Sequence, residues 1–256
     1  MVLTIANMKG GVSKTTLTQN LGFGLVRAGY SVLLIDLDGQ YNLTQTFLEY
    51  EQEQTVYDLL EAESKNQLTP QASDLIYRFD NSPHLLPGGS KMAYVDLDLS
   101  GATRREGLLE RRLRTTLPRY DFVLIDTPPS FGLAIQNALT ISDYILIPVL
   151  AEYLPMHGVK QFIGRIDTFF AGIEDRPQIG GIILNQYDPR KLLSKGLAEN
   201  IKKHLGDIVL NTAIRQNIAI SEAQAAREDV FTYDPDSNGA KDYQALTEEI
   251  INRLKA

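Results

Sequence analysis

Cysteine is absent from the 256 residues of this chain. Its absence excludes a disulfide framework, a cysteine nucleophile and a thiolate site for zinc or an iron–sulfur cluster. Long apolar segments are absent too, because no run reaches the roughly 20 residues of a membrane helix. The first residues enter a predicted strand directly, so we expect a cytoplasmic protein without a signal peptide.

The chain also lacks a segment that reads as a linker between domains. Apolar strands alternate with helical patterns along the sequence, which is typical of an α/β architecture. A chain of 256 residues is long enough to bury one substantial core. We therefore predict a single α/β domain over residues 1–256.

The ordinary phosphate-binding motif lacks both of its glycines here. The pattern G-x-x-x-x-G-K-[ST] needs glycine at two positions that hold Met8 and Ser13. What remains is K-G-G-x-x-K-[ST] at residues 9–15, in which Gly10 and Gly11 are free to adopt unusual backbone angles. An apolar run precedes this loop and leucines at helical spacing follow it, so we expect it to connect a buried strand to a helix.

This loop has the chemistry of a nucleotide site. The N–H groups of a helix's first turn attract anions, Lys14 can reach phosphate groups, and the Thr15 hydroxyl can bind Mg²⁺. The alternative is a glycine-rich turn with solvated lysines. The predicted nucleotide-binding residues in the loop are Gly10, Gly11, Val12, Ser13, Lys14, Thr15 and Thr16.

Two apolar strands end in carboxylates. VLLIDLDGQ at residues 32–40 carries Asp36 and Asp38, and YDFVLIDTPP at residues 120–129 carries Asp126. Parallel sheets bind ligands beyond the carboxyl ends of their strands, so we expect the three aspartates to converge on the loop. Asp126 is predicted to hold Mg²⁺ through water, and Asp38 to orient the attacking water. The predicted metal residues are Thr15, Asp38 and Asp126. For any one of these aspartates, the alternative is a helix N-cap.

Several ordered motifs carry a resemblance to a known family. They are KGGVSKTT at 9–16, LLIDLDGQYNLT at 33–44, YDFVLIDTPPS at 120–130, SDYILIPV at 142–149, LNQYDPR at 184–190, SEA at 221–223 and YDPDSNGAKDY at 233–243. With these motifs the chain resembles the ParA/MinD group of deviant Walker ATPases, and more closely its ParA/Soj branch. The resemblance implies ATP and Mg²⁺ as cofactors, and a doubly wound, mostly parallel sheet with helices on both faces.

The same resemblance implies roles for individual residues. Lys9 is the signature lysine that reaches the partner's ATP in a nucleotide-sandwiched homodimer, and with Lys14 and Asp38 it forms the predicted catalytic set. Asn185 and Asn217 are assigned to the nucleotide, Asn185 beside the adenine. The alternative for Lys9 is an exposed lysine, or one that serves its own nucleotide.

The chain departs from the family pattern at several positions. Ser13 stands where glycine is usual, and Gly39 stands where the family usually has proline, which we expect to loosen the loop carrying Asp38. The family arginines near Gln216 and Ala219 are missing, and Arg215 stands one place earlier.

A local basic segment interrupts an acidic chain. The net charge is −7, yet residues 186–227 carry seven basic and four acidic side chains, or +3, which leaves −10 for the remainder. Such a face can bind phosphate backbone weakly and without sequence preference. A solvated helix surface is the alternative. The predicted DNA-binding residues are Arg190, Lys191, Lys195, Lys202, Lys203 and Arg215.

Hydrophobic periodicity predicts the remaining elements. We expect strands at 31–36, 121–125, 143–148 and 178–184, and helices at 56–62, 104–115, 135–139, 159–171 and 193–205. Residues 63–101 are the least regular and could hold a partner site. Residues 241–256 form an amphipathic pattern without a basic excess, which favours packing on the core over membrane binding.

The predicted protein is a nucleoid-associated ParA-type ATPase that does not bind membranes. An adaptor, either ParB-like or a carboxysome adaptor, would stimulate slow ATP hydrolysis and so position a plasmid, a chromosome origin or a carboxysome. The alternatives are a MinD-like membrane-surface switch and an assembly ATPase that binds only protein partners.

Overall fold

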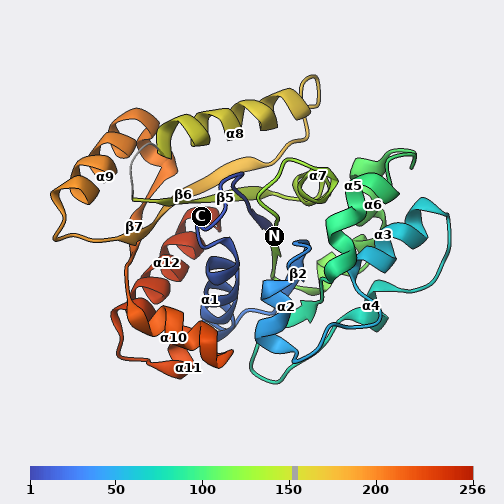
Figure 1. Ribbon diagram of the computed structural model, residues 1–256, viewed down its shortest axis with the longest axis horizontal. Coiled ribbons are helices and arrows are strands. Elements are labelled where there is room, and N and C mark those ends of the chain that lie inside the picture. Colours follow the sequence, from blue (N-terminus) through green and yellow to red (C-terminus); the bar gives the residue numbers. More distant parts are fainter. Residues whose placement is uncertain (152–154, 256) are drawn as a thin grey trace.

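The computed structural model describes residues 1–151 and 155–255, which form an α/β fold around one seven-stranded sheet (Figure 1). Each pairing between neighbouring strands is parallel, in the order β3-β2-β4-β1-β5-β6-β7. The strands are β1 (Val2–Ile5), β2 (Val32–Asp36), β3 (His84–Leu86), β4 (Phe122–Asp126), β5 (Tyr144–Leu150), β6 (Gln178–Tyr187) and β7 (Val209–Arg215).

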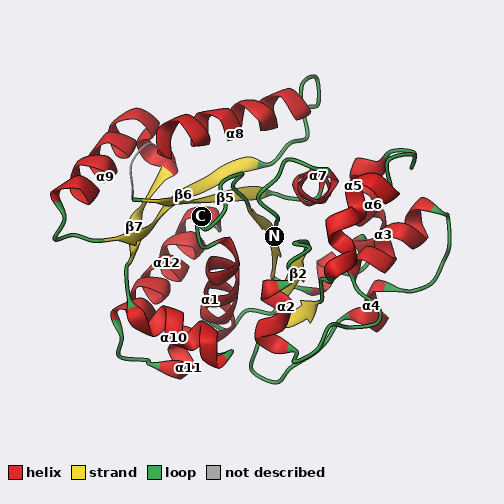
Figure 2. Cartoon of the chain, viewed as in Figure 1, coloured by secondary structure: helices red, strands yellow, loops and turns green. Residues whose placement is uncertain are grey.

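Helices cover both faces of the sheet (Figure 2). The α-helices are α1 (Lys14–Arg27), α2 (Asn42–Phe47), α3 (Val56–Ser64), α4 (Ala72–Leu75), α5 (Val95–Asp98), α6 (Leu108–Leu113), α7 (Leu133–Thr140), α8 (Pro155–Phe169), α9 (Leu192–Leu205), α10 (Ile218–Ala226), α11 (Val230–Tyr233) and α12 (Asn238–Leu254). Short 3₁₀ turns are η1 (Ser90–Tyr94), η2 (Arg105–Gly107), η3 (Leu117–Arg119) and η4 (Gly206–Ile208). The predicted fold class is confirmed, whereas the single-domain assignment for residues 1–256 stays a prediction.

Alternating strand residues build separate cores on the two faces. Leu3 and Leu34 pack in the core that contains α1, α11 and α12. Leu33 and Ile35 point the other way, into the core that contains α3, α5 and α6. A third core, under α8 and α9, extends the same layer over β5 and β6. Burial on both faces explains why the central strands read as continuous apolar runs.

The sequence predicted the five central strands but missed the two edge strands. β3 has only three residues and lies between Pro83 and Pro87. Prolines on both sides are typical of a turn, so the sequence did not predict a strand there. β7 includes the polar residues Asn211 and Thr212. Their backbone N–H groups donate to the Glu249 carboxylate of α12, at 2.7 Å in both cases. β7 lies at the sheet edge and its middle residues are exposed or only partly buried, so its sequence is not a continuous apolar run.

Predicted helices are present with shifted ends. Gly29 has φ of +90° directly after α1, as a left-handed helix end requires. The helix predicted at 104–115 is broken into η2 and the shorter α6. Residues 63–101 contain α4, β3, η1 and α5, so they are more ordered than the sequence suggested.

The C-terminal helix packs on the core, as predicted. Tyr243, Leu246 and Ile250 of α12 are buried in the core that contains α1. The predicted helix ran to Ala256, which lies outside the described residues. No helix within the described ranges is long and apolar enough to span a bilayer.

Candidate functional site

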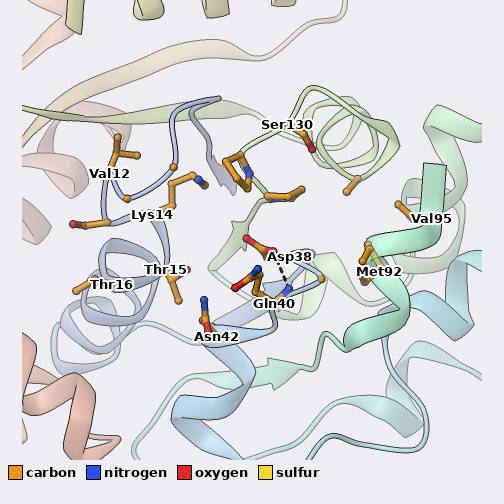
Figure 3. Close-up of a pocket in the computed structure, with 18 of the residues that line it drawn as sticks. Val12, Lys14, Thr15, Thr16, Asp38, Gln40, Asn42, Met92, Val95 and Ser130 are labelled. Carbon is orange, nitrogen blue, oxygen red and sulfur yellow. Dashed lines mark hydrogen bonds between the residues drawn. The ribbon is translucent and has the colours of Figure 1, made fainter. Parts of the chain in front are cut away.

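Two adjoining cavities lie at the carboxyl ends of the central strands. The larger, about 620 Å³, lies between the phosphate-binding loop and the loop after β2. The smaller, about 200 Å³, lies beside the start of α10. Ser13, Thr16 and Gln224 line both cavities, so the two meet at the first turn of α1. Figure 3 shows Lys14 and Asp38 pointing into the larger cavity from its two sides.

The sheet order brings the predicted motifs together. β4 lies between β1 and β2, and Asp126 pairs in register with both Ile5 and Asp36. The loop after β1, the end of β4 and the loop after β2 therefore start side by side. This juxtaposition is the convergence that the strand-end aspartates predicted.

Two residues of the phosphate-binding loop have left-handed backbone angles. Gly11 has φ of +71° and Ser13 has φ of +66°. Glycine adopts this region freely, whereas a residue with Cβ pays on the order of 1 kcal/mol. The Ser13 side chain makes no capping hydrogen bond to α1. The departure from the family glycine at this position therefore places uncompensated backbone strain at the start of the helix.

A buried amide fixes the beginning of the loop. The Asn7 Nδ2 donates to the Pro148 carbonyl at 2.8 Å, and its Oδ1 accepts from the Lys9 N–H at 2.9 Å. Asn7 thus connects the end of β5 to the loop. Asn7 was not identified from the sequence, although a single amide residue directly after an apolar run could have indicated it. Lys9 itself is exposed and lines neither cavity.

Lys14 and Thr15 line the larger cavity, and the fully buried Asp126 is hydrogen-bonded to Thr15. Burial lowers the pKa of Lys14, and the carboxylates of Asp126 and Asp38 oppose that change. The Thr15 hydroxyl donates to Asp126 Oδ2 at 2.6 Å, while Asp126 Oδ1 is buried and has no hydrogen-bond partner among the described residues. Burial raises the pKa of Asp126 to about 8, and the nearby charge of Asp36 adds to the rise.

This donor set fits Mg²⁺. The cation prefers oxygen ligands, and the Thr15 hydroxyl and the unpartnered Asp126 oxygen lie together. A bound cation would favour the Asp126 carboxylate and so offset the cost of burying its charge. Within the described ranges, no three His, Cys, Asp or Glu side chains are grouped to hold a metal by themselves. Water and phosphate oxygens would have to complete the coordination.

Asp36 and Asp38 have different surroundings. Asp36 is fully buried, and its Oδ2 accepts from the N–H and the hydroxyl of Thr44, both at 2.8 Å. Burial raises the pKa of Asp36 to about 6, against these hydrogen bonds. Asp38 is partly exposed, lines the larger cavity, and accepts at Oδ1 from the Gln40 N–H at 2.9 Å. Asp36 therefore holds the start of α2, and Asp38 alone of the two presents a carboxylate to the cavity.

The smaller cavity contains both predicted asparagines. Asn185 Nδ2 donates to the Val12 carbonyl at 3.0 Å, and its buried Oδ1 has no partner among the described residues. Asn217 caps α10, with its Oδ1 accepting from the Ala219 N–H at 2.8 Å. An unpartnered acceptor such as Asn185 Oδ1 suits the amino edge of a nucleobase, because a buried polar atom is costly until it is paired.

The far wall of the larger cavity was not predicted. It comes from the turn and short helix at 90–98, within the segment that looked irregular in sequence. No nucleotide motif marks this segment, since only the tertiary fold brings it against the loop after β2. The residues it contributes are Met92, Ala93, Val95 and Asp96.

The predicted basic surface lies on and before α9. The side chains of Lys195, Lys202 and Lys203 are exposed on this helix. Arg190 is 89% exposed but its guanidinium contacts the Asp188 carboxylate at 3.0 Å, and Lys191 lies 4.0 Å from the same group. α9 covers the sheet near β7, away from the end where α3 and α6 lie (Figure 1).

Arg215 differs from the other predicted DNA-binding residues. Its Nη2 and Nε donate to Asp242 Oδ1 and Oδ2 at 2.6 and 2.9 Å, and its backbone N–H donates to the same carboxylate at 2.9 Å. The guanidinium is thus engaged within the chain and joins β7 to α12. In this arrangement the Arg215 guanidinium is occupied by Asp242 and is not free to bind a phosphate.

Comparison with known proteins identifies relatives of the chain. The family model of the AAA domain matches residues 1–179. The chromosome-partitioning ATPase Soj of Thermus thermophilus is 34% identical over 255 residues, which is 99% of this chain and 96% of that protein. The sporulation initiation inhibitor protein Soj of Bacillus subtilis is 34% identical over 251 residues, 97% of each chain.

A solved structure agrees as well. The cobyrinic acid a,c-diamide synthase of Mycobacterium smegmatis, with a bound ATP analogue and magnesium, superposes with a TM-score of 0.84 at 27% identity, covering 100% of this chain and 96% of that one. From the family model, the two near-full-length Soj relatives and the site geometry together, this chain belongs to the AAA domain family and, within it, to the ParA/Soj partition ATPases.

Proposed function

We propose that this ParA/Soj-type ATPase binds ATP with Mg²⁺ across the two adjoining cavities and forms a homodimer in that state. The dimer binds nucleoid DNA without sequence preference, and an adaptor protein stimulates hydrolysis to release it. The cycle positions a cargo, which could be a plasmid, a chromosome origin or a carboxysome.

One observation supports nucleotide binding most directly. Among the described residues, two of the three buried polar side-chain atoms that lack a hydrogen-bond partner, Asp126 Oδ1 and Asn185 Oδ1, belong to this site. One suits a cation beside the phosphates, and the other suits the base. A nucleotide with its metal would satisfy both atoms.

The hydrolytic roles follow from position. Lys14 faces the phosphates from the first turn of α1, where it can neutralise charge that develops on the γ-phosphate. Asp38 is the partly exposed carboxylate on the opposite side and is proposed to orient the attacking water. Thr15 and Asp126 hold the metal, which supplies additional positive charge to the phosphates when bound.

Lys9 is proposed to act on the nucleotide of the partner subunit. Its backbone is fixed through Asn7, yet its side chain is exposed and outside its own cavities. A cation held there could complete the partner's site only after two subunits meet. ATP binding would thereby be coupled to dimerisation, and dimerisation would double the DNA contacts of the α9 surface.

Gel mobility shift with random-sequence DNA, ATP and Mg²⁺ tests the proposal. We expect retention with ATP and none with ADP, together with a dimer by light scattering. Asp38→Ala should form a persistent dimer without steady-state hydrolysis, whereas Lys9→Ala should bind ATP but remain monomeric. Absence of DNA retention in every nucleotide state would refute the DNA-binding function and leave the assembly ATPase. ATP-dependent sedimentation with liposomes would favour the membrane-surface switch instead.

A further inference from the structure

We propose that Gly39 is a positioning residue for ATP hydrolysis. The absence of a side chain at position 39 lets the turn at 90–94 support the loop that carries Asp38. This inference rests on the proposed role of Asp38 in orienting the attacking water. It also gives a different reason for the glycine that replaces the family proline. Glycine would be needed because it leaves space for the turn at 90–94, and not because it makes the loop flexible.

The inner side of the Asp38 loop is held by hydrogen bonds. The Asp38 N–H donates to Asp36 Oδ1 at 3.1 Å, and the Tyr41 N–H donates to the Asp38 carbonyl at 2.9 Å. Asp36 also holds Thr44, whose hydroxyl accepts from the Gly88 N–H at 2.8 Å. The loop is therefore joined on this side to β2, to α2 and to the chain directly after β3.

The outer side of the loop packs closely on the turn at 90–94. A Cβ on Gly39 would lie 2.6 Å from the backbone nitrogen of Ala93 and 2.9 Å from its Cα and Cβ. Two of these three atoms belong to the backbone, so no change of rotamer could relieve the contact. Gly39 does not have a positive φ. Glycine is needed here for the space it leaves.

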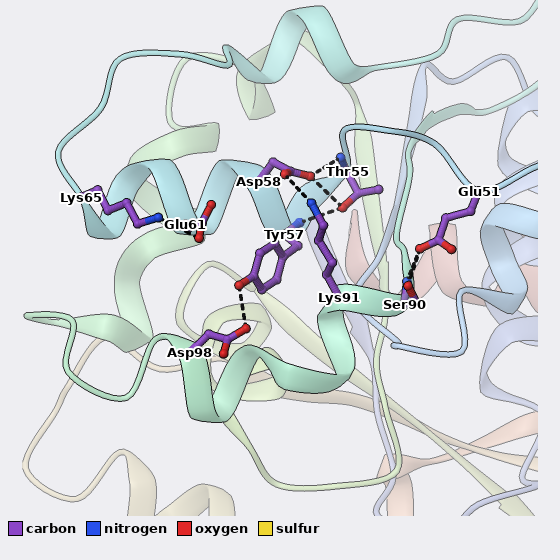
Figure 4. A network of polar contacts seen from close by, with 9 residues as sticks. All are labelled: Glu51, Thr55, Tyr57, Asp58, Glu61, Lys65, Ser90, Lys91 and Asp98. Carbon is purple, nitrogen blue, oxygen red and sulfur yellow. Dashed lines mark hydrogen bonds and ion pairs between the residues drawn. The ribbon is translucent and has the colours of Figure 1, made fainter.

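The turn at 90–94 is itself anchored on its outer side. Glu51 Oε1 accepts from the N–H and the hydroxyl of Ser90 at 2.5 and 2.7 Å (Figure 4). The Lys91 ammonium lies 3.3 Å from Asp58 Oδ1, at the start of α3. These contacts join the turn to the segment before α3 and to α3 itself.

The short helix that follows the turn is anchored as well. The Tyr57 hydroxyl donates to Asp98 Oδ2 at 2.7 Å (Figure 4). Asp96 Oδ1 accepts from the Leu133 N–H at 2.5 Å, at the start of α7. A Cβ on the preceding residue, Gly132, would collide with the Asp96 carboxylate. Because the turn and the helix are both held, we expect a side chain at position 39 to shift the Asp38 loop.

The displacement has a specific kinetic signature. The phosphate-binding loop and Asn185 belong to segments other than the Asp38 loop, so nucleotide binding should survive a small shift of that loop. Orientation of the attacking water should not survive it, because a misplacement of about 1 Å can cost on the order of 100-fold in rate. A purely structural role for Gly39 would instead lower binding and turnover together.

The test measures the kcat of ATP hydrolysis and the affinity for a fluorescent ATP analogue with Mg²⁺. We expect Gly39→Ala to lower kcat at least tenfold, with analogue affinity within twofold of the unchanged protein. Adding Ala93→Gly removes one of the three close atoms and should restore kcat in part. Gly101→Ala is the matched control, because Gly101 is exposed and a Cβ there meets nothing within 4 Å.

The outcomes separate this inference from the proposed function. If Asp38→Ala hydrolyses ATP normally, the proposed role of Asp38 fails. If Asp38→Ala is inactive while Gly39→Ala has the same kcat as Gly101→Ala, the positioning role is overturned. The positioning role is also overturned if Gly39→Ala loses nucleotide affinity and kcat to the same extent. If Gly39→Ala does not fold, Ala93→Gly alone provides the test, because it removes a methyl group that packs against the Asp38 loop. We expect this variant to lower kcat about threefold with nucleotide binding unchanged. An unchanged kcat would overturn the inference.

Discussion

The nucleotide cavity and the α9 surface hold their charged groups in opposite ways. In the cavity, Lys14 is only 7% exposed and Asp126 is fully buried and bonded to Thr15. On α9, Lys202 and Lys203 are exposed and form no ion pair with any described residue. A buried charge depends on one set of close contacts, whereas exposed charges act together through their summed electrostatic potential. Single substitutions should therefore abolish function in the cavity but only weaken it on α9.

Loss of the buried lysine should have the largest effect. Lys14→Ala is expected to weaken ATP binding by about 100-fold, because a charge-assisted contact in a shielded site contributes about 2–3 kcal/mol. Titration with a fluorescent ATP analogue measures the change. Lys65→Ala, which removes an exposed lysine paired with Glu61, serves as the control and should bind normally. Binding of the analogue by Lys14→Ala within a few-fold of normal would contradict the buried geometry.

Neutralising two exposed lysines should have a smaller effect. Lys202→Gln with Lys203→Gln is expected to lower DNA affinity on the order of tenfold and to reduce the slope of log affinity against log salt by about 2. Mobility shifts at several salt concentrations measure both. Arg215→Gln is the contrasting variant, since it breaks the pair with Asp242. It should lower the melting temperature and leave the salt slope unchanged, and a reduced slope would return Arg215 to the DNA surface.

The buried Asp126 should make stability depend on pH. Because its pKa is raised to about 8 in the folded chain, ionisation costs stability progressively as the pH rises from about 4, the unfolded value, to above 8. Asp126→Asn removes that cost. Without nucleotide, the variant should melt several degrees above the unchanged protein at pH 9 and by a much smaller margin at pH 5. Equal melting temperatures at both pH values would show that the carboxyl is not buried uncharged.

The smallest effect is expected at the strained loop. Ser13→Gly removes the cost of a left-handed serine and should raise the free energy of unfolding by up to about 1 kcal/mol, part of which the flexibility of glycine in the unfolded chain offsets. Chemical denaturation measures the difference. Ser13→Ala keeps Cβ and should show no gain, so a gain in both variants would point away from backbone strain.

The same contrast explains what could be predicted from sequence. Residues 9–16, Asp38 and Asp126 were identified because a nucleotide site needs fixed residue types at fixed spacing. The central strands were identified because burial on both faces demands apolar runs. Close contacts between segments that are distant in the sequence follow no such pattern of residue types and spacing. The contact between Gly39 and Ala93, like the pairing of Arg215 with Asp242, joins segments that only the tertiary fold brings together.

The short and polar elements were missed for a related reason. β3 has only three residues, and β7 includes polar, partly exposed residues in its middle. The η1 turn and α5 are too brief to show a helical period. These elements nevertheless shape the site, because η1 and α5 form the far wall of the larger cavity.

The Glu249 carboxylate at the edge of β7 has a consequence for assembly. By accepting from the N–H groups of Asn211 and Thr212, it occupies donors that an incoming strand from another molecule would need. Sheet-to-sheet growth into open-ended fibres is thereby disfavoured at this edge. If subunits meet through the nucleotide site, the block at β7 helps the association stop at a closed pair.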